Sequence, residues 1–229
     1  MCRDNSKDHR IGHRKRLRAR FLQAGHEALA DYELLELLLG YCIPRKDTKL
    51  LAKTLINTFG SFSAVFDQPV EKLQEIKGSG QAVAAFLLSI KASMTEYLKE
   101  RAENATFLSS PHDVAKFVRL AIGSDQRECV MVLCLNSANR LIHHEIMAKG
   151  TVDQAPVYYR EILKLALLHN ATAMILVHNH PSGNAAPSRD DHLTTKKLTA
   201  LAAEFNIELY DHLIVCPSYA YSIKSNIRL

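Results

Sequence analysis

The first half of the chain carries apolar residues at the spacing that is typical of helices. Helices are predicted over four segments, at 32–39, 48–59, 69–76 and 81–101. Gly40 and Gly60 follow two of these segments, and glycine is a common residue at the end of a helix. Asp47 or Thr48 can cap the second helix. Between residues 82 and 90 the last helix is apolar on almost every side, so we expect it at the buried centre of a helical domain.

Strand patterns replace helical ones in the second half, after a stretch at 103–111 that is typical of a linker. Strands are predicted at 129–135, 141–147, 171–177, 207–215 and 219–223, and helices at 156–169 and 188–205. The turn-rich residues 136–140 predict a hairpin between the first two strands. Helices interleaved with a mixed or mostly antiparallel sheet indicate an α/β or α+β domain. We therefore expect a helical domain at 21–104 and a mixed-sheet domain at 107–229.

Positive charge is concentrated at the start of the chain. The whole sequence carries +5, from 29 Lys and Arg against 24 Asp and Glu. The first twenty residues hold eight of the basic groups and two of the acidic ones, so they carry +6 and the rest of the chain carries −1. The sequence therefore predicts a basic arm at 1–20 on a nearly neutral body, and it excludes a uniformly basic nucleic-acid binder.

Composition and segment lengths exclude several other classes of protein. An apolar content of 47% is typical of globular chains and too high for a disordered one. The longest apolar run, 82–88, is far shorter than the roughly 20 residues that span a bilayer. The charged N-terminus lacks the apolar segment of a secretory signal, and the five cysteines include no CxxC pair. We expect reduced thiols in a cytoplasmic protein that makes no membrane contact.

A compact group of candidate metal ligands follows the predicted strand at 171–177. In an extended chain, residues two apart project to the same side, so His178 and His180 can aim imidazole nitrogens at one point about 2 Å away. Asp191 lies in the first turn of the following helix, where it can supply a carboxylate. Two imidazoles and one carboxylate suit zinc, and three protein ligands leave a fourth position open, as in catalytic sites.

Simpler interpretations of the same residues exist. Two histidines after a strand can belong to a solvated turn, and Ser188 with Asp191 can form only a capping box at the start of the helix. A His-x-His pair alone is a weak signal for a metal. The same pair followed by Ser188 and Asp191 at this spacing is much more specific.

The spacing of these residues resembles the JAMM motif of the JAB/MPN metallopeptidase family. The strings HNHPSG and PSRDD, with the upstream GTVDQAPVYYREILKLALLHNA, are similar to the RadC (UPF0758-type) branch of that family, from about residue 107 to the C-terminus. The resemblance implies a cytidine-deaminase-like fold and a role for Ser188 in supporting an oxyanion. By position in LIHHEIMAKGT, the general base of the family corresponds to Glu145. The implied zinc ligands are His178, His180 and Asp191.

The chemistry implied by this resemblance needs a carboxylate near the metal. Zinc lowers the pKa of bound water towards ~7, and a carboxylate then takes the proton and passes it to a leaving amine. Glu145, in a strand 33 positions before His178, is the best candidate, although it can also be an ordinary exposed strand residue. Glu161 is a rival, but it lies on an amphipathic helix. Three histidines are interpreted as lying outside the ligand set: His143, His144 and His212, the last as a hydrogen-bonded strand residue.

The helical half carries a second resemblance, to the helical region at the front of RadC-type proteins. The string LQEIKGSGQAVA at 73–84 is similar to a helix-hairpin-helix motif, in which glycines expose backbone N–H groups that bind a DNA phosphate. Ser79 departs from that motif, because the residue between Gly78 and Gly80 is usually apolar. A purely structural helical hairpin is therefore an equal alternative to DNA binding.

The residues and the resemblances together predict a zinc-dependent hydrolase of peptide, isopeptide or other amide bonds, acting on a peptide or protein. The alternative is a DNA-associated repair accessory or a metal-dependent nuclease that contacts DNA through residues 1–20 and Gly78–Gly80. Nucleases more often use Mg²⁺ held by several carboxylates, frequently as a metal pair, so two imidazoles and one carboxylate argue against that chemistry. A third alternative is an inactive scaffold that retains the zinc.

Overall fold

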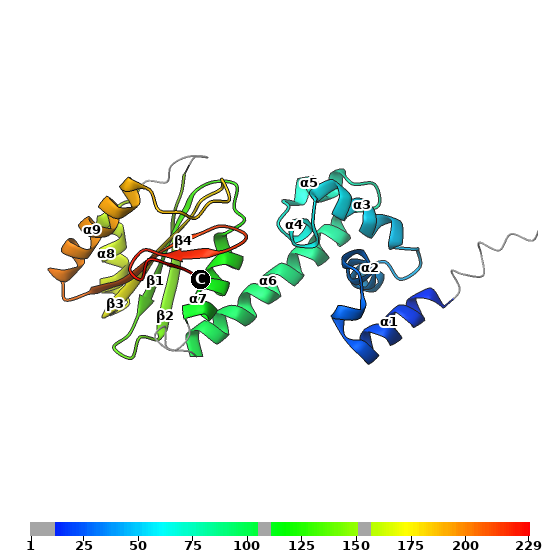
Figure 1. Ribbon diagram of the computed structural model, residues 1–229, viewed down its shortest axis with the longest axis horizontal. Helices are drawn as coiled ribbons and strands as arrows, with labels where there is room; N and C mark the ends of the chain where they lie inside the picture. The colour runs from blue at the N-terminus through cyan, green and yellow to red at the C-terminus, as the bar shows by residue number, and fades with distance from the viewer. Residues whose placement is uncertain (1–11, 105–110, 151–156) are drawn as a thin grey trace, which may run out of the picture. The chain divides into compact units, whose positions relative to one another are not determined.

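The structure, a computed structural model, describes residues 12–104, 111–150 and 157–229, which fall into two compact units (Figure 1). The first unit ends at Ala92 and the second begins at Ser93, inside one long helix, α6 (Gln81–Asn104). The first unit is helical, and the second is built on a six-stranded sheet. None of the described helices combines the length and the apolar character that crossing a membrane requires.

Apolar residues at helical spacing form the core of the first unit. Its elements are α1 (His13–Ala24), a 3₁₀ turn (His26–Ala28), α2 (Asp31–Cys42), α3 (Lys49–Phe59), α4 (Phe62–Phe66), α5 (Val70–Glu75) and the start of α6. Leu35, Leu55 and Leu87, from α2, α3 and α6, are fully buried in the same cluster. The four helices predicted for this half are present, whereas α1 and α4 are additional to the prediction.

The end of α2 differs from the sequence prediction, because the helix continues through Gly40 to Cys42. Gly60 does end α3, in the left-handed conformation at φ +92° that glycine adopts without steric cost. At the end of α2 a side chain from α1 instead binds one carbonyl of the last turn and three carbonyls of the loop that follows. The guanidinium of Arg14 donates hydrogen bonds to the carbonyls of four residues: Gly40 (3.3 Å), Ile43 (2.7 Å), Pro44 (2.7 Å) and Lys46.

At the start of α3, the two residues that were predicted as alternative caps have different roles. Thr48 occupies the N-cap position, but its hydroxyl donates to the carbonyl of Glu36 at 3.1 Å and caps nothing in α3. Asp47 accepts a hydrogen bond from the backbone N–H of Lys49 at 2.9 Å. The carboxylate of Asp47 therefore satisfies a donor in the first turn, while Thr48 ties α3 to α2.

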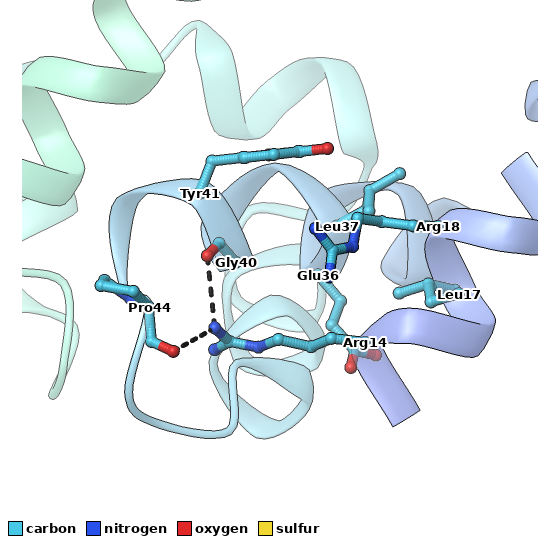
Figure 2. A pocket seen from close by; sticks show the side chains of 8 residues that line it. All are labelled: Arg14, Leu17, Arg18, Glu36, Leu37, Gly40, Tyr41 and Pro44. Atoms are coloured by element: carbon cyan, nitrogen blue, oxygen red, sulfur yellow. Dashed lines mark hydrogen bonds between the residues drawn. The ribbon is translucent and has the colours of Figure 1, made fainter. Parts of the chain in front are cut away.

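Arg14 also lines a pocket between α1 and α2 (Figure 2). Arg14→Ala is expected to loosen the end of α2, because four carbonyls lose a charged donor. A hydrogen bond from a charged group contributes ~2 kcal/mol when it is sheltered from water. Two of the four Arg14 bonds are exposed and contribute less. We therefore expect the variant to lose about 2 kcal/mol of local stability in total. Hydrogen exchange of the full chain, followed by mass spectrometry, should show faster exchange in the last turn of α2 and in the loop at 43–48.

Arg18→Ala is the matched control for this prediction. Arg18 lines the same pocket and is exposed, and no hydrogen bond from its guanidinium is seen within the described part of the chain. Equal protection of the α2 end in the two variants would show that the Arg14 bonds contribute nothing measurable.

The segment predicted as a basic arm at 1–20 is helical from His13 onward, so the predicted border at residue 20 falls inside α1. Leu17 is 2% exposed and anchors this helix. Arg20 pairs with Glu33 at 2.9 Å and donates to the carbonyl of Ala28 at 2.7 Å. Arg14 and Arg20 therefore bind groups of their own unit. Residues 1–11 lie outside the described residues.

The predicted hairpin at 73–84 comprises the end of α5, a turn and the start of α6. Gly78 has φ +95° in the turn, and Gly80 accepts the first backbone hydrogen bonds of α6 from Val83 and Ala84. Ser79 is 1% exposed, and its hydroxyl has no hydrogen-bond partner among the described residues. Ser79 therefore fills, as a polar residue, a position that is usually apolar in a helix-hairpin-helix motif. That interpretation of the hairpin stays a prediction.

The second unit contains a mixed sheet with the strand order β2-β1-β3-β4-β5-β6. Its strands are β1 (Cys129–Leu135), β2 (Leu141–Lys149), β3 (Ala173–Asn179), β4 (Glu208–Val215), β5 (Ala220–Ser222) and β6 (Ile227–Arg228). β3 pairs with β4 in parallel, and the other neighbours are antiparallel. Every residue of β1 and β3 is buried, because helices cover both faces of the sheet.

Alternate residues of the central strands face different helices. α7 (Pro111–Ile122) covers one face, and α8 (Tyr159–Leu168) and α9 (Arg189–Ala203) cover the other (Figure 1). Ile175 packs in the cluster that contains residues of α7. Leu176 packs in the cluster of α8 and α9. His178, two residues after Leu176, is therefore on the α9 side of the sheet.

The mixed-sheet class and the helical first half are confirmed, whereas a deaminase-like topology stays a prediction. β1 has the predicted bounds, and β3 runs two residues further than predicted because it pairs with β4 up to Asn179. α7 and β6 are additional to the prediction. Residues 105–110 of the predicted linker and Pro156 of the predicted helix 156–169 lie outside the described residues.

Candidate metal centre

The end of β3 carries the two histidines. His178 is the sixth residue of the strand and is 8% exposed. His180 follows the strand, and its backbone N–H still donates to the carbonyl of Val215 in β4 at 2.9 Å. The chain then turns at Gly183, which has φ +80° and donates to the carbonyl of His180 at 3.1 Å. Strand alternation and this continued pairing place both imidazoles on one side of the sheet.

The first turn of α9 carries the carboxylate. Ser188 is the N-cap, and its hydroxyl oxygen accepts a hydrogen bond from the backbone N–H of Asp191 at 3.2 Å. Asp191 Oδ2 accepts in return from the backbone N–H of Ser188 at 2.7 Å and from its hydroxyl at 2.6 Å. The capping box considered as a simpler interpretation is therefore real, and it fixes the position of the Asp191 carboxylate.

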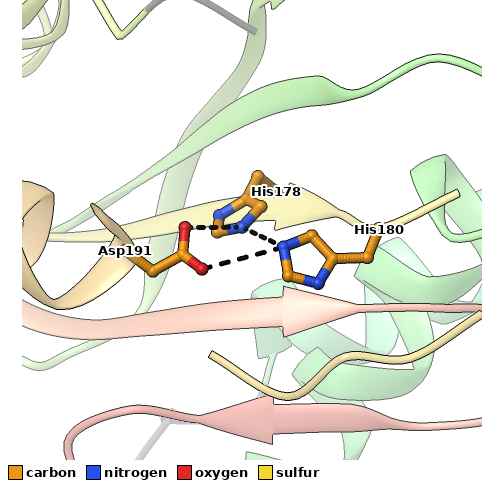
Figure 3. A group of neighbouring side chains, drawn as sticks. All are labelled: His178, His180 and Asp191. Carbon is orange, nitrogen blue, oxygen red and sulfur yellow. Dashed lines mark hydrogen bonds and ion pairs between the residues drawn. The ribbon is translucent and has the colours of Figure 1, made fainter. Parts of the chain in front are cut away.

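The three side chains converge on one point (Figure 3). His178 Nε2 lies 3.0 Å from His180 Nε2 and 3.1 Å from Asp191 Oδ1, and His180 Nε2 lies 3.8 Å from Asp191 Oδ2. One ligand atom from each residue lies within 4.8 Å of the others. Ligands about 2.0–2.1 Å from a tetrahedral ion are about 3.3 Å apart, so the spacing of these atoms fits a metal ion such as zinc.

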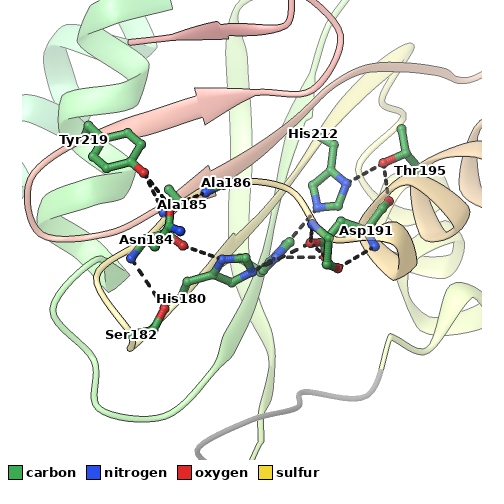
Figure 4. Close-up of polar contacts among 11 residues, drawn as sticks. His180, Ser182, Asn184, Ala185, Ala186, Asp191, Thr195, His212 and Tyr219 are labelled. Atoms are coloured by element: carbon green, nitrogen blue, oxygen red, sulfur yellow. Dashed lines mark hydrogen bonds and ion pairs between the residues drawn. The ribbon is translucent and has the colours of Figure 1, made fainter.

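The imidazole of His180 is held by a loop with its own hydrogen bonds (Figure 4). His180 Nδ1 lies 2.8 Å from the carbonyl oxygen of Asn184. A carbonyl only accepts, so we infer that Nδ1 carries the hydrogen and that Nε2 presents a lone pair to the site. The Asn184 side-chain oxygen accepts from the Tyr219 hydroxyl at 2.9 Å and from the Ala186 N–H at 3.0 Å. Tyr219 therefore fixes the loop that orients His180.

The second imidazole has a buried partner. His178 Nδ1 lies 2.8 Å from Nε2 of His212, which is on β4 and 1% exposed. Burial, followed by the neighbouring imidazole of His178, holds the pKa of His212 well below its usual range, so His212 is neutral. His212 is thus a hydrogen-bonded strand residue, and among the described residues it does not join the ligand group.

Asp191 is ionised in this setting. Burial alone would raise the pKa of Asp191, but the adjacent imidazole of His178, together with the hydrogen bonds from Ser188, outweighs it. The pKa therefore lies well below the usual range of an aspartate, and a carboxylate faces the two Nε2 atoms. The hydroxyl hydrogen of Ser188 is donated to Asp191, so in this arrangement it is not directed to a substrate oxygen.

Glu145 lies on β2, on the same side of the sheet as His178. Its cross-strand partner on β1 is Val132, which pairs in turn with Leu176, two residues before His178. Strand spacing places the Cα atoms of Glu145 and His178 about 12 Å apart. The side chain of Glu145 is 54% exposed, and its carboxylate lies 3.6 Å from Nε2 of His143. Glu145 is therefore outside the group of three ligands but faces the same side of the sheet.

The other candidates point elsewhere. Glu161 is half exposed in the first turn of α8, where it pairs with Lys164 at 3.5 Å. His143 stacks on His169 with 3.7 Å between ring centroids, and His144 meets Phe117 edge-on. The sequence interpretation did not include Asn184, Thr195 or Tyr219, whose contacts support the histidines. Only the position of Thr195, one helical turn after Asp191, offered a signal in the sequence.

Both parts of the chain match known protein families. The profile of the RadC-like JAB domain matches residues 108–228, and the profile of the UPF0758 N-terminal family matches residues 9–85. A UPF0758 protein of Ruegeria pomeroyi is 43% identical over 213 residues, which cover 93% of this chain and 95% of the relative. The resemblance to RadC-type proteins is thus confirmed. The chain belongs to the UPF0758 family and carries a RadC-like JAB domain in its second half.

Proposed function

We propose that this protein is a zinc-dependent hydrolase of amide bonds in peptides or proteins. The observation that carries the proposal is the convergence of two imidazole nitrogens and one carboxylate oxygen within 4.8 Å. The opposite nitrogen of each imidazole already has a hydrogen-bond partner, which orients the ring as in zinc sites. Membership in a family with a JAB domain supports a hydrolytic function.

The donor set favours zinc over other common metals. Mg²⁺ and Ca²⁺ prefer six or more oxygen ligands, whereas imidazole nitrogens with one carboxylate suit zinc. Structural zinc sites normally have four protein ligands. Among the described residues only His178, His180 and Asp191 form such a group, so one position stays open for a reactant.

In the proposed reaction, Glu145 and Ser188 have different roles. A zinc ion bound here would supply an activated water and polarise a carbonyl. Glu145 accepts a proton from the attacking water and passes it to the leaving amine, which requires its exposed side chain to reach towards the ligand group. Ser188 holds Asp191 in place. A further role of Ser188 in stabilising an oxyanion requires its hydroxyl hydrogen to turn from Asp191 to the substrate.

DNA contact has weaker support as a second function of the same chain. Two arginines of the basic segment, Arg14 and Arg20, already bind carbonyls or a carboxylate of the helical unit. Lys15 and Arg18 are exposed on α1, and Gly78 and Gly80 form a tight turn before α6. These features suit a phosphate contact, but the ligand group in the second unit does not resemble a two-metal nuclease site.

Metal and product analysis of the full chain tests the proposed function. The protein is purified without a metal-affinity step, passed through gel filtration and analysed for metals. We expect about one zinc per chain, because the described residues contain a single ligand group. The same sample is incubated with a peptide library made from a digested proteome, and new termini are detected by mass spectrometry. Cleavage should stop after a chelator removes the zinc and return when zinc is added.

Two results would count against the proposal in different ways. A protein that neither retains zinc nor takes it up would remove the metal site. A protein that holds stoichiometric zinc but cuts no peptide or folded protein substrate would support the third alternative, a scaffold that keeps the ion without the reaction.

A further inference from the structure

We propose that His212 and Thr195 are positioning residues that fix the tautomer of His178, so that His178 Nε2 is always the nitrogen offered to the metal. The proposal rests on the proposed metal site. It assigns a role to two residues outside the ligand group, one on β4 and one on α9. His212 contacts His178 and Thr195, and Thr195 contacts Asp191; Figure 4 shows His212, Thr195 and Asp191 side by side.

The hydroxyl of Thr195 determines where the first hydrogen lies. Thr195 Oγ1 is 2.6 Å from the backbone carbonyl oxygen of Asp191, one turn earlier in α9. Two oxygens this close must share a hydrogen, and a carbonyl brings none. The single hydroxyl hydrogen of Thr195 therefore points to Asp191, and Thr195 can only accept from any other neighbour.

His212 is that neighbour. His212 Nδ1 lies 2.7 Å from Thr195 Oγ1, so Nδ1 must carry a hydrogen and donate it. A neutral imidazole has only one N–H, which leaves a lone pair on His212 Nε2. His178 Nδ1 lies 2.8 Å from this lone pair, and it must therefore be the donor. The hydrogen of His178 is held on Nδ1, and the lone pair of a neutral His178 lies on Nε2.

The result matches what a metal requires of both histidines. His180 reaches the same state by donating its Nδ1 hydrogen to the carbonyl of Asn184. His178 Nε2 and His180 Nε2 then face each other at 3.0 Å as two lone pairs beside the Asp191 carboxylate. Three electron-rich atoms at this spacing repel one another unless a cation lies between them. The outer hydrogen bonds thus prepare the site for a cation.

Three hydrogen bonds and the contact between His178 and the Asp191 carboxylate form a closed ring that starts and ends on Asp191. Its carbonyl accepts from Thr195, its carboxylate faces His178, and His212 joins Thr195 to His178. Because Asp191 and Thr195 lie in adjacent turns of α9, the position of that helix sets both the ligand and the tautomer. An apolar residue in place of buried His212 would leave His178 Nδ1 without an acceptor.

The test compares three threonine variants by zinc affinity, measured in competition with a chromophoric chelator. Thr195→Val keeps the shape of the side chain but removes the acceptor for His212, and we expect about 10- to 100-fold weaker zinc binding. Thr195→Ser keeps a hydroxyl and should bind like the wild type. Thr199→Val is the matched control, because Thr199 makes the same bond to the carbonyl four residues earlier, at 2.8 Å, without touching His212.

A second measurement separates tautomer control from a loss of structure. Nitrogen-15 NMR of the metal-free, histidine-labelled protein should place the hydrogen of His178 on Nδ1 in the wild type and in Thr195→Ser. In Thr195→Val the hydrogen of His178 should be distributed between Nδ1 and Nε2. His212→Gln retains an oxygen acceptor for His178 and should bind zinc more tightly than His212→Leu, which retains none.

The outcomes distinguish this inference from the proposed function. Failure of the wild type to bind zinc would overturn the metal site itself. A wild type that binds zinc, with Thr195→Val and Thr199→Val equal in affinity, would overturn the positioning role. Weaker binding in Thr195→Val with an unchanged His178 tautomer would overturn it as well, because the loss would then be structural.

Discussion

Asp191→Asn is expected to remove stoichiometric zinc from the purified protein. Asparagine keeps the size of the side chain and an oxygen that can accept from the backbone N–H of Ser188, so α9 should stay capped. The negative charge disappears, and a neutral amide is a poor zinc ligand beside two neutral imidazoles. Metal analysis after gel filtration should fall from about one zinc per chain to near zero.

Asp190→Asn is the matched control for this change. Asp190 lies next to Asp191 in the first turn of α9 and is exposed, so the variant removes one negative charge at the same helix end. It should keep its zinc, because Asp190 is outside the ligand group found among the described residues. Full zinc in Asp191→Asn, or equal loss in both variants, would show that the carboxylate is not a ligand.

Glu145→Gln should separate metal binding from catalysis. Glutamine has the same length but cannot take a proton from water, so amide cleavage should fall by about 10²- to 10⁴-fold. The zinc content should not change, since Glu145 lies outside the ligand group. The measurement is the rate at which new termini form in the peptide library, at equal zinc content in the two proteins.

Glu161→Gln serves as the comparison for this second prediction. Glu161 is also a half-exposed glutamate, and within the described part of the chain its ion pair is with Lys164 of the same helix, α8. Its replacement should leave the cleavage rate within about twofold, as expected for a surface change. Unchanged turnover in Glu145→Gln would remove Glu145 from the mechanism, and a large loss in Glu161→Gln would make Glu161 the better candidate.

The parts of the fold that depend on local patterns could be predicted from the sequence. β1 is a run of seven apolar residues bounded by polar ones, so its bounds follow from composition alone. The end of α2 could not be predicted, because it depends on Arg14, which comes from another helix. The last two residues of β3 depend in the same way on pairing with β4.

In the candidate site, too, the residues with a local signal could be predicted and those that depend on distant contacts could not. His178, His180, Ser188 and Asp191 lie within 14 residues of one another, and their spacing alone indicated a metal site and a capping box. The support for these residues comes from distant parts of the chain. His212 reaches His178 only because β3 and β4 run parallel, and Tyr219 reaches the loop of Asn184 from beyond the end of β4. Pairing of this kind leaves no mark in local spacing.

Because the carboxylate of Asp191 also closes the capping box of α9, the first turn of that helix is stabilised whether or not an ion is present. The ligands of a zinc finger differ, since they come together only when the metal folds the domain. Under the proposed function, the metal-free protein is therefore a preorganised receptor, in which the ion would be lost and regained without refolding.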